Sequence, residues 1–452
     1  MEILEKVENQ ARTQPHHIAL TFNAQHMTYA ELENDMKIKS TLFWSIPKHS
    51  FVGLVIQNPQ TTISLYLALL KRDCVPCVFD YRWTKEQINN LVEKYGIPYL
   101  MYEDHHLIHT KVNNDKLDFN EDLLHIGFTS GTTGIPKAYY RGEKSWVKSF
   151  IENEQLFERA IGTIIAPGPL SHSLSLYACI YALYTGRAFI GQQYFDAENI
   201  MKNIQGRLDN IACFLVPTMI QACLSTQICI KGNHYILSTG DKLTLYHRQR
   251  VNTFFPNSDL IEFFGTSEAS FISYNFNNSA PSESVGKLFQ SVKMNVDQPD
   301  ELGIGVLKIQ SELAFSGYVE EGICYYTWIE TGDFAFYDNN GYLYLRGRKH
   351  DRMIIGGRNV YPSEIENSAQ QLHIFDEVIV INETHSKFGE IAVLLYTGDE
   401  EVTYKYFKSL MMQRLARYQI PSKIFKVKRM LYTQSGKIAR SHMKQYYLKG
   451  EL

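Results

Sequence analysis

The stretch TSGTTGIPK, residues 129–137, directly follows the apolar run LLHIGF at residues 123–128. The apolar run predicts a buried β-strand, so the hydroxyl and glycine residues after it are expected to form a loop at the end of that strand. Glycine lets backbone N–H groups approach an anion, hydroxyls donate hydrogen bonds, and Lys137 adds a positive charge. The spacing differs from the P-loop pattern GxxxxGK[ST]. The stretch therefore predicts a phosphate-binding loop, with a flexible surface turn as the alternative.

On both sides of this loop, short apolar runs alternate with helix-like segments. The order FVGLVI, TTISLYLALLKR, CVPCVFD, TKEQINNLVEKYG and IPYLMY precedes it, and the rhythm resumes in ACFLVPT, HYILSTG and DLIEFFG. This alternation is typical of βαβ units, in which helices cover a parallel sheet. The expected fold class is therefore α/β, with mostly parallel sheets packed with helices.

The pattern changes near residue 285. From there to residue 347, the runs VGKLF, GIGVLKIQ and GYLYLRG predict closely spaced strands, which we interpret as a β-rich subdomain. After the charged junction GRKHD, the strand-like run EVIVI and a helix-like segment near 404–415 indicate a smaller α+β unit. We therefore expect a large N-terminal domain at residues 1–347 and a small C-terminal domain at 348–452.

Composition limits the possible partners. The chain has 452 residues and a formal net charge of −3, so no global basic field attracts nucleic acid or an anionic membrane. Its seven cysteines lie mostly in apolar runs, which predicts reduced thiols in a cytoplasmic protein. Cys74 and Cys77 in CVPC could form half of a metal or redox site, but their apolar surroundings favour a buried strand. We expect neither a secretory signal nor a transmembrane segment.

The loop sequence TSGTTGIPK resembles the phosphate-loop signature of the adenylate-forming superfamily. This superfamily comprises acyl- and aryl-CoA synthetases, peptide-synthetase adenylation domains and luciferases. The resemblance continues in order through APGPLSHS (166–173), STGDKL (238–243), EFFGTSEAS (262–270), WIETGD (328–333), GYLYLRGRKHD (341–351), IIGGRNVYPSEIE (354–366) and YTQSGKIAR (432–440). Such ordered agreement over most of the chain is hard to produce by chance.

The resemblance implies an ATP site built from several motifs. Glu268 would hold Mg²⁺ on the ATP phosphates, since a hard cation prefers oxygen ligands, and Thr266 would donate to the α-phosphate. Adenine would lie between the ring of Phe264 and the flat backbone of residues 240–242; without the neighbouring motifs, both phenylalanines of this run would be interpreted as core. Without the neighbouring motifs, Glu268 would be interpreted as a solvated carboxylate. The implied ATP- and AMP-binding residues here are Thr129, Ser130, Gly131, Thr132, Thr133, Gly134, Lys137, Gly240, Asp241, Lys242, Phe263, Phe264 and Gly265.

Three further residues complete the implied active site. Asp333 would accept hydrogen bonds from both ribose hydroxyls, which the two oxygens of a carboxylate suit. Arg348 would contact ribose or phosphate. Lys437 would be the catalytic lysine that bridges the substrate carboxylate and the α-phosphate as charge moves to pyrophosphate.

The family also implies that the small C-terminal domain is mobile. It would rotate about the junction and bring the loop with Gly356 and Gly357 beside the thiol. At the hinge, where relatives usually have aspartate or lysine, this chain has His350. The histidine could make the motion sensitive to pH, or it could simply be tolerated there.

His172 matches the residue that flanks the acyl pocket in acyl-CoA synthetases. The apolar run after it would suit an acyl tail, although a core helix that begins with a hydrogen-bonded histidine would have the same sequence. No acidic residue follows to hold the amine of an amino acid, so an amino acid is disfavoured and a fatty or other apolar acid is expected. Ser173 and Leu174 replace the usual glycines, a departure that could narrow or alter the pocket.

The predicted function is that of an AMP-forming acyl-CoA synthetase. It would use ATP and Mg²⁺ to make acyl-AMP and pyrophosphate, and would then transfer the acyl group to coenzyme A, the thiol favoured by the motif GGRN at 356–359. This function would place the protein in fatty-acid metabolism. The identity of the acid stays open. Two alternatives stay open: loading of a carrier protein, and a nucleotide-binding regulator without catalytic activity.

Overall fold

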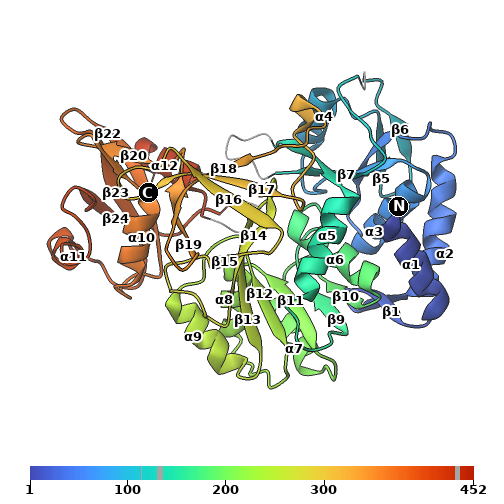
Figure 1. The fold of residues 1–452 in the computed structure, drawn as a ribbon, viewed down its shortest axis with the longest axis horizontal. Helices are drawn as coiled ribbons and strands as arrows, with labels where there is room; N and C mark the ends of the chain where they lie inside the picture. The colour runs from blue at the N-terminus through green and yellow to red at the C-terminus, as the bar shows by residue number, and fades with distance from the viewer. Residues whose placement is uncertain (113–114, 130–135, 433–437, 452) are drawn as a thin grey trace. The chain divides into compact units, whose positions relative to one another are not determined.

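A computed structural model describes residues 1–112, 115–129, 136–432 and 438–451. By internal contacts the chain divides into two compact units. The first comprises Met1–Lys293 and Ile309–Ile329, and the second comprises Met294–Lys308 and Glu330–Leu452. Figure 1 shows the elements of each unit.

The first unit contains a nine-stranded sheet that is parallel in its middle. Its order is β15 (Lys287–Leu288), β14 (Ser270–Phe276), β13 (Asp259–Thr266), β12 (Tyr235–Ser238), β11 (Ile211–Leu215), β9 (Thr163–Ile165), β10 (Ala188–Gly191), β1 (Ile18–Phe22) and β2 (Gln25–Thr28). The strands from β13 to β1 pair in parallel, and the strands at both edges are antiparallel. The predicted βαβ architecture is therefore confirmed.

A six-stranded sheet in the same unit carries the predicted phosphate loop. Its order is β6 (Leu107–His109), β5 (Tyr99–Tyr102), β3 (Phe51–Val55), β4 (Val75–Val78), β7 (Leu123–Phe128) and β8 (Ala138–Gly142). Strands β5, β3, β4 and β7 are parallel, whereas β8 runs antiparallel to β7. The loop thus connects the two strands of a buried hairpin.

Of the nine helices that the structure describes in this unit, five begin at a residue whose side chain caps the first turn. The nine are α1 (Glu2–Thr13), α2 (Tyr29–Ser40), α3 (Pro59–Lys71), α4 (Lys85–Tyr95), α5 (Glu143–Glu154), α6 (Ser173–Thr185), α7 (Ala197–Gln205), α8 (Pro217–Ser225) and α9 (Leu245–Phe254). The segment TKEQINNLVEKYG forms α4: Thr84 and Gln87 make a capping box, and Gly96 ends the helix with a φ of 71°.

The second unit contains most of the β-rich region and all of the C-terminal elements. A four-stranded sheet has the order β16 (Val292–Asp297), β17 (Gly305–Ser311), β18 (Ile329–Tyr337) and β19 (Leu343–Arg348). A five-stranded sheet follows, with β21 (Arg358–Val360), β20 (Met353–Ile355), β23 (Gly389–Thr397) and β22 (Glu377–His385) in order, and β24 (Lys423–Lys426) paired with β23. The expected strands after residue 285 are confirmed, whereas a domain boundary at residue 347 stays a prediction.

Helices pack on both faces of the five-stranded sheet. Alternation along β22 sends Val378 and Val380 to the core shared with α10 (Pro362–Gln370) and α11 (Tyr404–Met411). Ile379 and Ile381 instead join the core under α12 (Arg440–Lys449). This period of two is the one expected for a strand covered on both sides.

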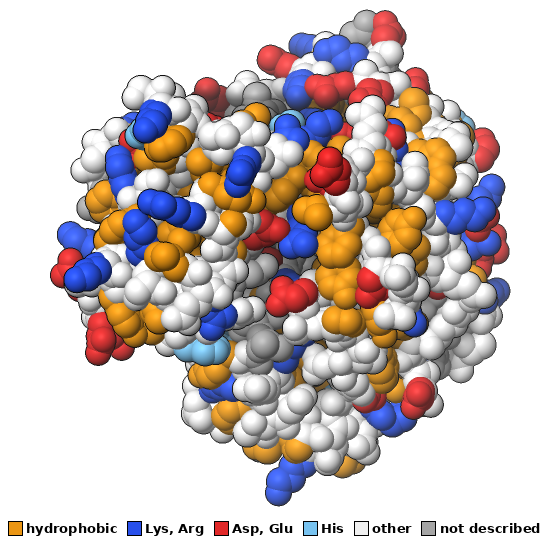
Figure 2. All heavy atoms as spheres, turned by 60° about the vertical axis from the view of Figure 1, so that its left-hand side comes forward, with side chains coloured by type: hydrophobic (Ala, Val, Ile, Leu, Met, Phe, Trp, Pro, Cys, Tyr) orange, Lys and Arg blue, Asp and Glu red, His pale blue; other side chains and the backbone are white. Residues whose placement is uncertain are grey.

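The C-terminal segment is rich in Lys and Arg, which the overall charge conceals. Residues 402–450 contain twelve Lys or Arg residues and no Asp or Glu. Figure 2 turns this unit toward the viewer and shows Lys and Arg side chains gathered among hydrophobic ones. Two of these cations pair with acidic residues outside the segment, Lys423 with Glu383 and Arg440 with Glu366. The excess of positive charge therefore belongs to the segment, while the whole chain keeps a small net negative charge.

All seven cysteines are free thiols, five of them buried. Cys74 and Cys77 lie at β4, as expected of a buried strand, and the described residues form no cluster of three or more potential metal ligands. Among those same residues, every helix is too short or too polar to cross a lipid bilayer.

His125, on β7, is a titratable group sealed into this fold. The side chain is 1% exposed, lies against Trp146 and shares a hydrogen bond of 3.1 Å with the Tyr66 hydroxyl. Burial lowers the pKa of His125 from 6.5 to about 3, and the charge of Arg141 adds to the shift. The imidazole therefore stays neutral in the native protein.

This burial predicts a loss of stability in mild acid. The unfolded chain binds a proton at His125 below pH 6.5, and the native chain does not do so until pH falls to about 3. Stability should therefore fall as pH decreases through this window, by about 2 kcal/mol from His125 between pH 7 and 5. Urea unfolding at both pH values should show a smaller loss for His125→Asn, and an unchanged loss for the exposed-site control His442→Asn. Equal losses in all three proteins would contradict the assignment.

Candidate functional site

The hairpin of β7 and β8 closes the base of the predicted phosphate loop. Phe128 pairs with Ala138, and the Thr129 N–H donates to the carbonyl of Lys137 over 2.9 Å. These bonds hold the two ends of the loop together. The predicted loop residues between them, Ser130, Gly131, Thr132, Thr133 and Gly134, lie outside the described residues.

Lys137 leaves the loop beside an aromatic residue. Its ammonium lies 5.1 Å from the ring centre of Tyr318, and the lysine itself is exposed. A cation over the face of an aromatic ring is attracted to it only weakly when water can reach the site. The charge of Lys137 therefore has a resting position from which it can reach an anion.

Glu268 lies in the turn between β13 and β14. The Thr266 hydroxyl accepts a hydrogen bond of 3.0 Å from the Ala269 N–H, and the Phe315 N–H donates to the Glu268 carbonyl over 2.7 Å. The hydroxyl of Tyr318 donates to the Glu268 carboxylate in a short contact. Burial and this carboxylate together raise the pKa of Tyr318 well above its usual value. The tyrosine is therefore the donor.

Tyr318 thus joins two residues that the sequence predicted independently. One face of its ring is close to Lys137, and its hydroxyl holds Glu268. No sequence signal assigned Tyr318 to the site, because its partners lie far along the chain. Glu268 would be the one Mg²⁺ ligand that the protein supplies here. This fits Mg²⁺, because the phosphate oxygens of a bound nucleotide would supply further ligands.

The predicted adenine loop follows β12. Gly240 has a φ of 92°, and the Lys242 N–H donates to the carboxylate of Asp241 over 2.8 Å. Burial lowers the pKa of Lys242 to about 8. Glu262 accepts from the Leu243 N–H and pairs with Arg248, so the loop is tied to β13.

The two predicted aromatic residues of β13 differ in environment. Phe263 is 7% exposed and packs against Phe214 and Phe271, with its ring centre 4.8 Å from that of Phe271. Phe264 is only partly buried. This placement favours Phe264 as the ring available to a base, while a contact to nucleotide stays a prediction for both.

His172 is the N-cap residue of α6 and lies beside a buried carboxylate. Its Nε2 is 4.0 Å from Oδ2 of Asp80, and Asp80 is paired with Arg82 by contacts of 2.5 and 2.8 Å. Burial lowers the pKa of His172; the charge of Asp80 opposes this shift and that of Arg82 adds to it. The imidazole is therefore expected to be neutral near pH 7.

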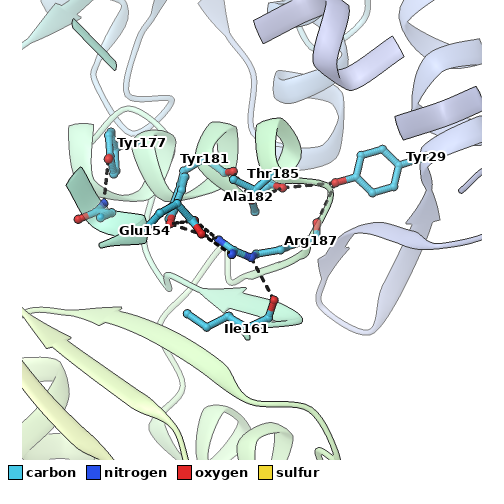
Figure 3. Close-up of polar contacts among 9 residues, drawn as sticks. Tyr29, Glu154, Ile161, Tyr177, Tyr181, Ala182, Thr185 and Arg187 are labelled. Carbon is cyan, nitrogen blue, oxygen red and sulfur yellow. Dashed lines mark hydrogen bonds and ion pairs between the residues drawn. The ribbon is translucent and has the colours of Figure 1, made fainter. Parts of the chain in front are cut away.

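The run after His172 is packed as a core helix. Residues Leu176 to Leu183 of α6 are at most 5% exposed. Tyr177 accepts a hydrogen bond from Asn153, and Tyr181 and Arg187 both contact Glu154; Figure 3 shows these as two separate groups of polar contacts. The core-helix interpretation therefore describes this segment, and Ser173 and Leu174 at its start are the less buried part.

In the second unit, the structure brings two predicted ribose residues together. Asp333 and Arg348 are opposite each other on β18 and β19, and the Arg348 Nε is 2.9 Å from Oδ1 of Asp333. Asp333 is 4% exposed, whereas Arg348 reaches the surface. The buried carboxylate is thus held in one orientation by its cross-strand cation.

The remaining predicted residues of this unit lie in turns. Gly356 and Gly357 have φ of 57° and 78° between β20 and β21, a two-residue hairpin that favours glycine. His350 is exposed. Lys437 lies outside the described residues, but Arg440 shortly after it is anchored to Glu366 at 2.5 Å and to Asp351 at 3.3 Å.

Comparison with known proteins identifies the family of this chain. The family model described as AMP-binding enzyme matches residues 114–319. The protein named "Putative long chain fatty acid-CoA ligase VraA" of Staphylococcus epidermidis is 46% identical, with 100% of both chains aligned. The chain belongs to this family. As predicted, it is an ATP-dependent acyl-CoA ligase of the AMP-binding enzymes.

More distant acyl-CoA ligases and solved structures agree. The "Uncharacterized acyl--CoA ligase YhfT" of Bacillus subtilis is 27% identical over 99% of this chain and 98% of its own. The o-succinylbenzoate CoA synthetase MenE of Bacillus subtilis, solved with the acyl-adenylate intermediate OSB-AMP, has a TM-score of 0.84 at 20% identity over 97% of both chains. ATP-bound MatB from Rhodopseudomonas palustris also has a TM-score of 0.84, at 19% identity over 99% of this chain and 100% of its own. These likenesses confirm the predicted fold.

The turn that carries Glu268 leaves no room for a side chain at Gly265. A Cβ there would lie 2.2 Å from the carbonyl oxygen of Ser270. Gly265→Ala should therefore shift the turn, lower the free energy of unfolding by about 1–3 kcal/mol and weaken binding of MgATP. Gly206→Ala is the control, because its nearest neighbour would be 3.6 Å away. Thermal unfolding and calorimetric titration measure both effects; equal behaviour of the two variants would contradict this account.

Proposed function

We propose that this ligase activates a fatty or other apolar carboxylic acid and transfers it to coenzyme A in the cytoplasm. The observation that carries the nucleotide part is the shared contact of Lys137 and Glu268 with Tyr318. The acid class is supported by the name of the relative that is 46% identical, and by the absence of an acidic residue in the sequence 173–185 that could hold a substrate amine.

In the first half-reaction, an oxygen of the acid attacks the α-phosphorus of ATP, and the bond from that phosphorus to pyrophosphate breaks. Bound Mg²⁺ would neutralise charge on the phosphates, and Glu268 would be its protein ligand. Lys137 and the loop N–H groups would hold the phosphates, Thr266 the α-phosphate, and Asp333 and Arg348 the ribose. Lys437 would stabilise the charge that develops on the oxygens.

In the second half-reaction, the sulfur of coenzyme A attacks the acyl carbon. The carbon–oxygen bond to AMP breaks, AMP leaves, and the thiol proton passes to solvent. The cationic residues between 402 and 450 support coenzyme A as the acceptor, because its phosphates are anionic and no acidic residue in that segment opposes them. Free thiols at all seven cysteines support a reducing compartment.

The start of α6 is the part of that helix best suited to meet the acid. Residues 175–183 in its middle are buried in the core, whereas His172, Ser173 and Leu174 at its start retain exposure. We propose that the acyl chain passes this first turn. A neutral imidazole at His172 suits this role, since a charged group would be costly beside an apolar tail.

Acid-dependent exchange between ATP and radiolabelled pyrophosphate tests the proposal. Straight-chain acids of increasing length should support exchange, and amino acids should not. Coenzyme A should then yield a thioester, while a phosphopantetheinylated carrier protein should remain unloaded. Loading of the carrier in place of coenzyme A would favour the carrier-loading alternative. Absence of exchange with fatty, aryl and amino acids would favour the regulator.

A second test addresses the catalytic lysine. Lys437→Ala should slow formation of the acyl-adenylate at least a hundredfold, since it removes a charge aimed at the developing negative oxygens. The second half-reaction, started from synthetic acyl-adenylate, should change little. Lys449→Ala removes an exposed lysine of α12; it is the control and should retain both rates. A normal adenylation rate in Lys437→Ala would remove this role.

A further inference from the structure

Arg141 is a buried cation directly behind the candidate site. It lies on β8, is 3% exposed, and stands opposite His125 of β7. Its guanidinium donates to the carbonyl of Ser267 over 2.5 Å, to the carbonyl of Leu313 over 2.9 Å, and to the Ser145 hydroxyl over 3.4 Å. All three acceptors are neutral oxygens.

Such a residue is costly for the fold. Among the described residues, Arg141 forms no ion pair, and burial lowers the pKa of its guanidinium. A buried charge is tolerated only where its donors are satisfied. Packing alone would be served as well by an apolar side chain, so the contacts of Arg141 indicate a positional role.

Those contacts hold both sides of the Glu268 turn. Ser267 directly precedes Glu268, and Leu313 begins the segment whose Phe315 N–H donates to the Glu268 carbonyl. Arg141 therefore fixes the carbonyl of the residue before Glu268 and also the irregular segment whose Phe315 N–H donates to the Glu268 carbonyl.

Strand β8, which contains Arg141, also positions Tyr318, whose hydroxyl donates to the Glu268 carboxylate. The Tyr140 N–H donates to Gly317 over 2.9 Å and the Tyr140 carbonyl accepts from Ser316 over 2.9 Å, next to Tyr318. Strand β8 also begins immediately after Lys137. Strand β8 thus positions Tyr318 and the Glu268 turn through hydrogen bonds, and it directly follows Lys137 in the chain.

We propose that Arg141 is a positioning residue for Glu268, and that its fork of donors sets how tightly the protein binds nucleotide together with its divalent cation. The proposal rests on the assignment of Glu268 under the proposed function. Residues that orient a metal ligand typically change metal affinity by about 10–100-fold when they are replaced. Lysine would keep the charge but cannot reach two carbonyls in fixed directions.

Calorimetry of nucleotide binding tests this on the full chain without any acid. ATP with Mg²⁺ and ATP with EDTA are titrated into wild type, Arg141→Gln, Arg141→Lys and Tyr318→Phe. We expect Arg141→Gln to weaken MgATP binding at least tenfold and metal-free ATP binding less than twofold. Arg141→Lys should lose threefold to tenfold for MgATP, and Tyr318→Phe should shift in the same direction.

Arg187 provides a matched control. It too is largely buried and donates to the carbonyl of Ile161 over 3.0 Å, but its carboxylate partner is Glu154 and none of its contacts belongs to the site (Figure 3). Arg187→Gln should lower the unfolding temperature and leave the ratio of MgATP to ATP affinity unchanged.

The outcomes separate the two proposals. If Arg141→Gln and Arg141→Lys keep the wild-type ratio of MgATP to ATP affinity, Arg141 is merely structural and the inference is wrong. If Arg141→Gln does not fold, the ratio of MgATP to ATP affinity of Arg141→Lys decides whether the inference holds. Wild-type protein that binds MgATP but exchanges no pyrophosphate with any acid would overturn the proposed function and leave the role of Arg141 to be decided by binding.

Discussion

The candidate site depends on one constraint: strand β8 is buried along its whole length although it contains an arginine. All five residues from Ala138 to Gly142 are buried, so the guanidinium of Arg141 must find its acceptors inside the protein. The carbonyls of Ser267 and Leu313 satisfy it. The turn with Glu268 is therefore held in place by β8, a strand of a different sheet. The predicted phosphate loop directly precedes this same strand. Loop and turn are coupled through the core.

Much of this could be predicted from sequence, because the signals are local. The alternation of short apolar runs with helix-like segments indicated parallel sheets. The motifs predicted a phosphate loop at the end of a strand and assigned Glu268, Asp333 and Arg348 to a nucleotide site. The β7–β8 hairpin and the pairing of Asp333 with Arg348 across two strands come from the structure. Each of the predicted features is defined by neighbours a few residues away, or by a family pattern of fixed spacing.

The contacts that organise the site are long-range and left no such signal. Arg141 and Ser267 are 126 residues apart, and Tyr318 and Glu268 are 50 apart. The family resemblance named Phe264 as the adenine wall, but the residue pattern alone did not separate the environments of Phe263 and Phe264. A register shift between Phe264 and Gly265 interrupts the pairing of β13 with β14, so simple alternation does not say which ring faces the core. Likewise, the letters of α6 fitted either an acyl-binding surface or a core helix, and only packing distinguishes them.

The two cations on either side of the Glu268 turn have opposite physical characters. Lys137 is exposed and rests over a ring, an interaction worth about 0.5–1 kcal/mol at such sites, so it can move to a phosphate at little cost. Arg141 makes charge-assisted hydrogen bonds of about 1.5–3 kcal/mol each to buried carbonyls and cannot follow. Arg141 is therefore a fixed charge behind Glu268, whereas Lys137 is a charge that water can reach. Only the fixed charge is preorganised in the sense used for electrostatic catalysis, because it needs no rearrangement to act on Glu268.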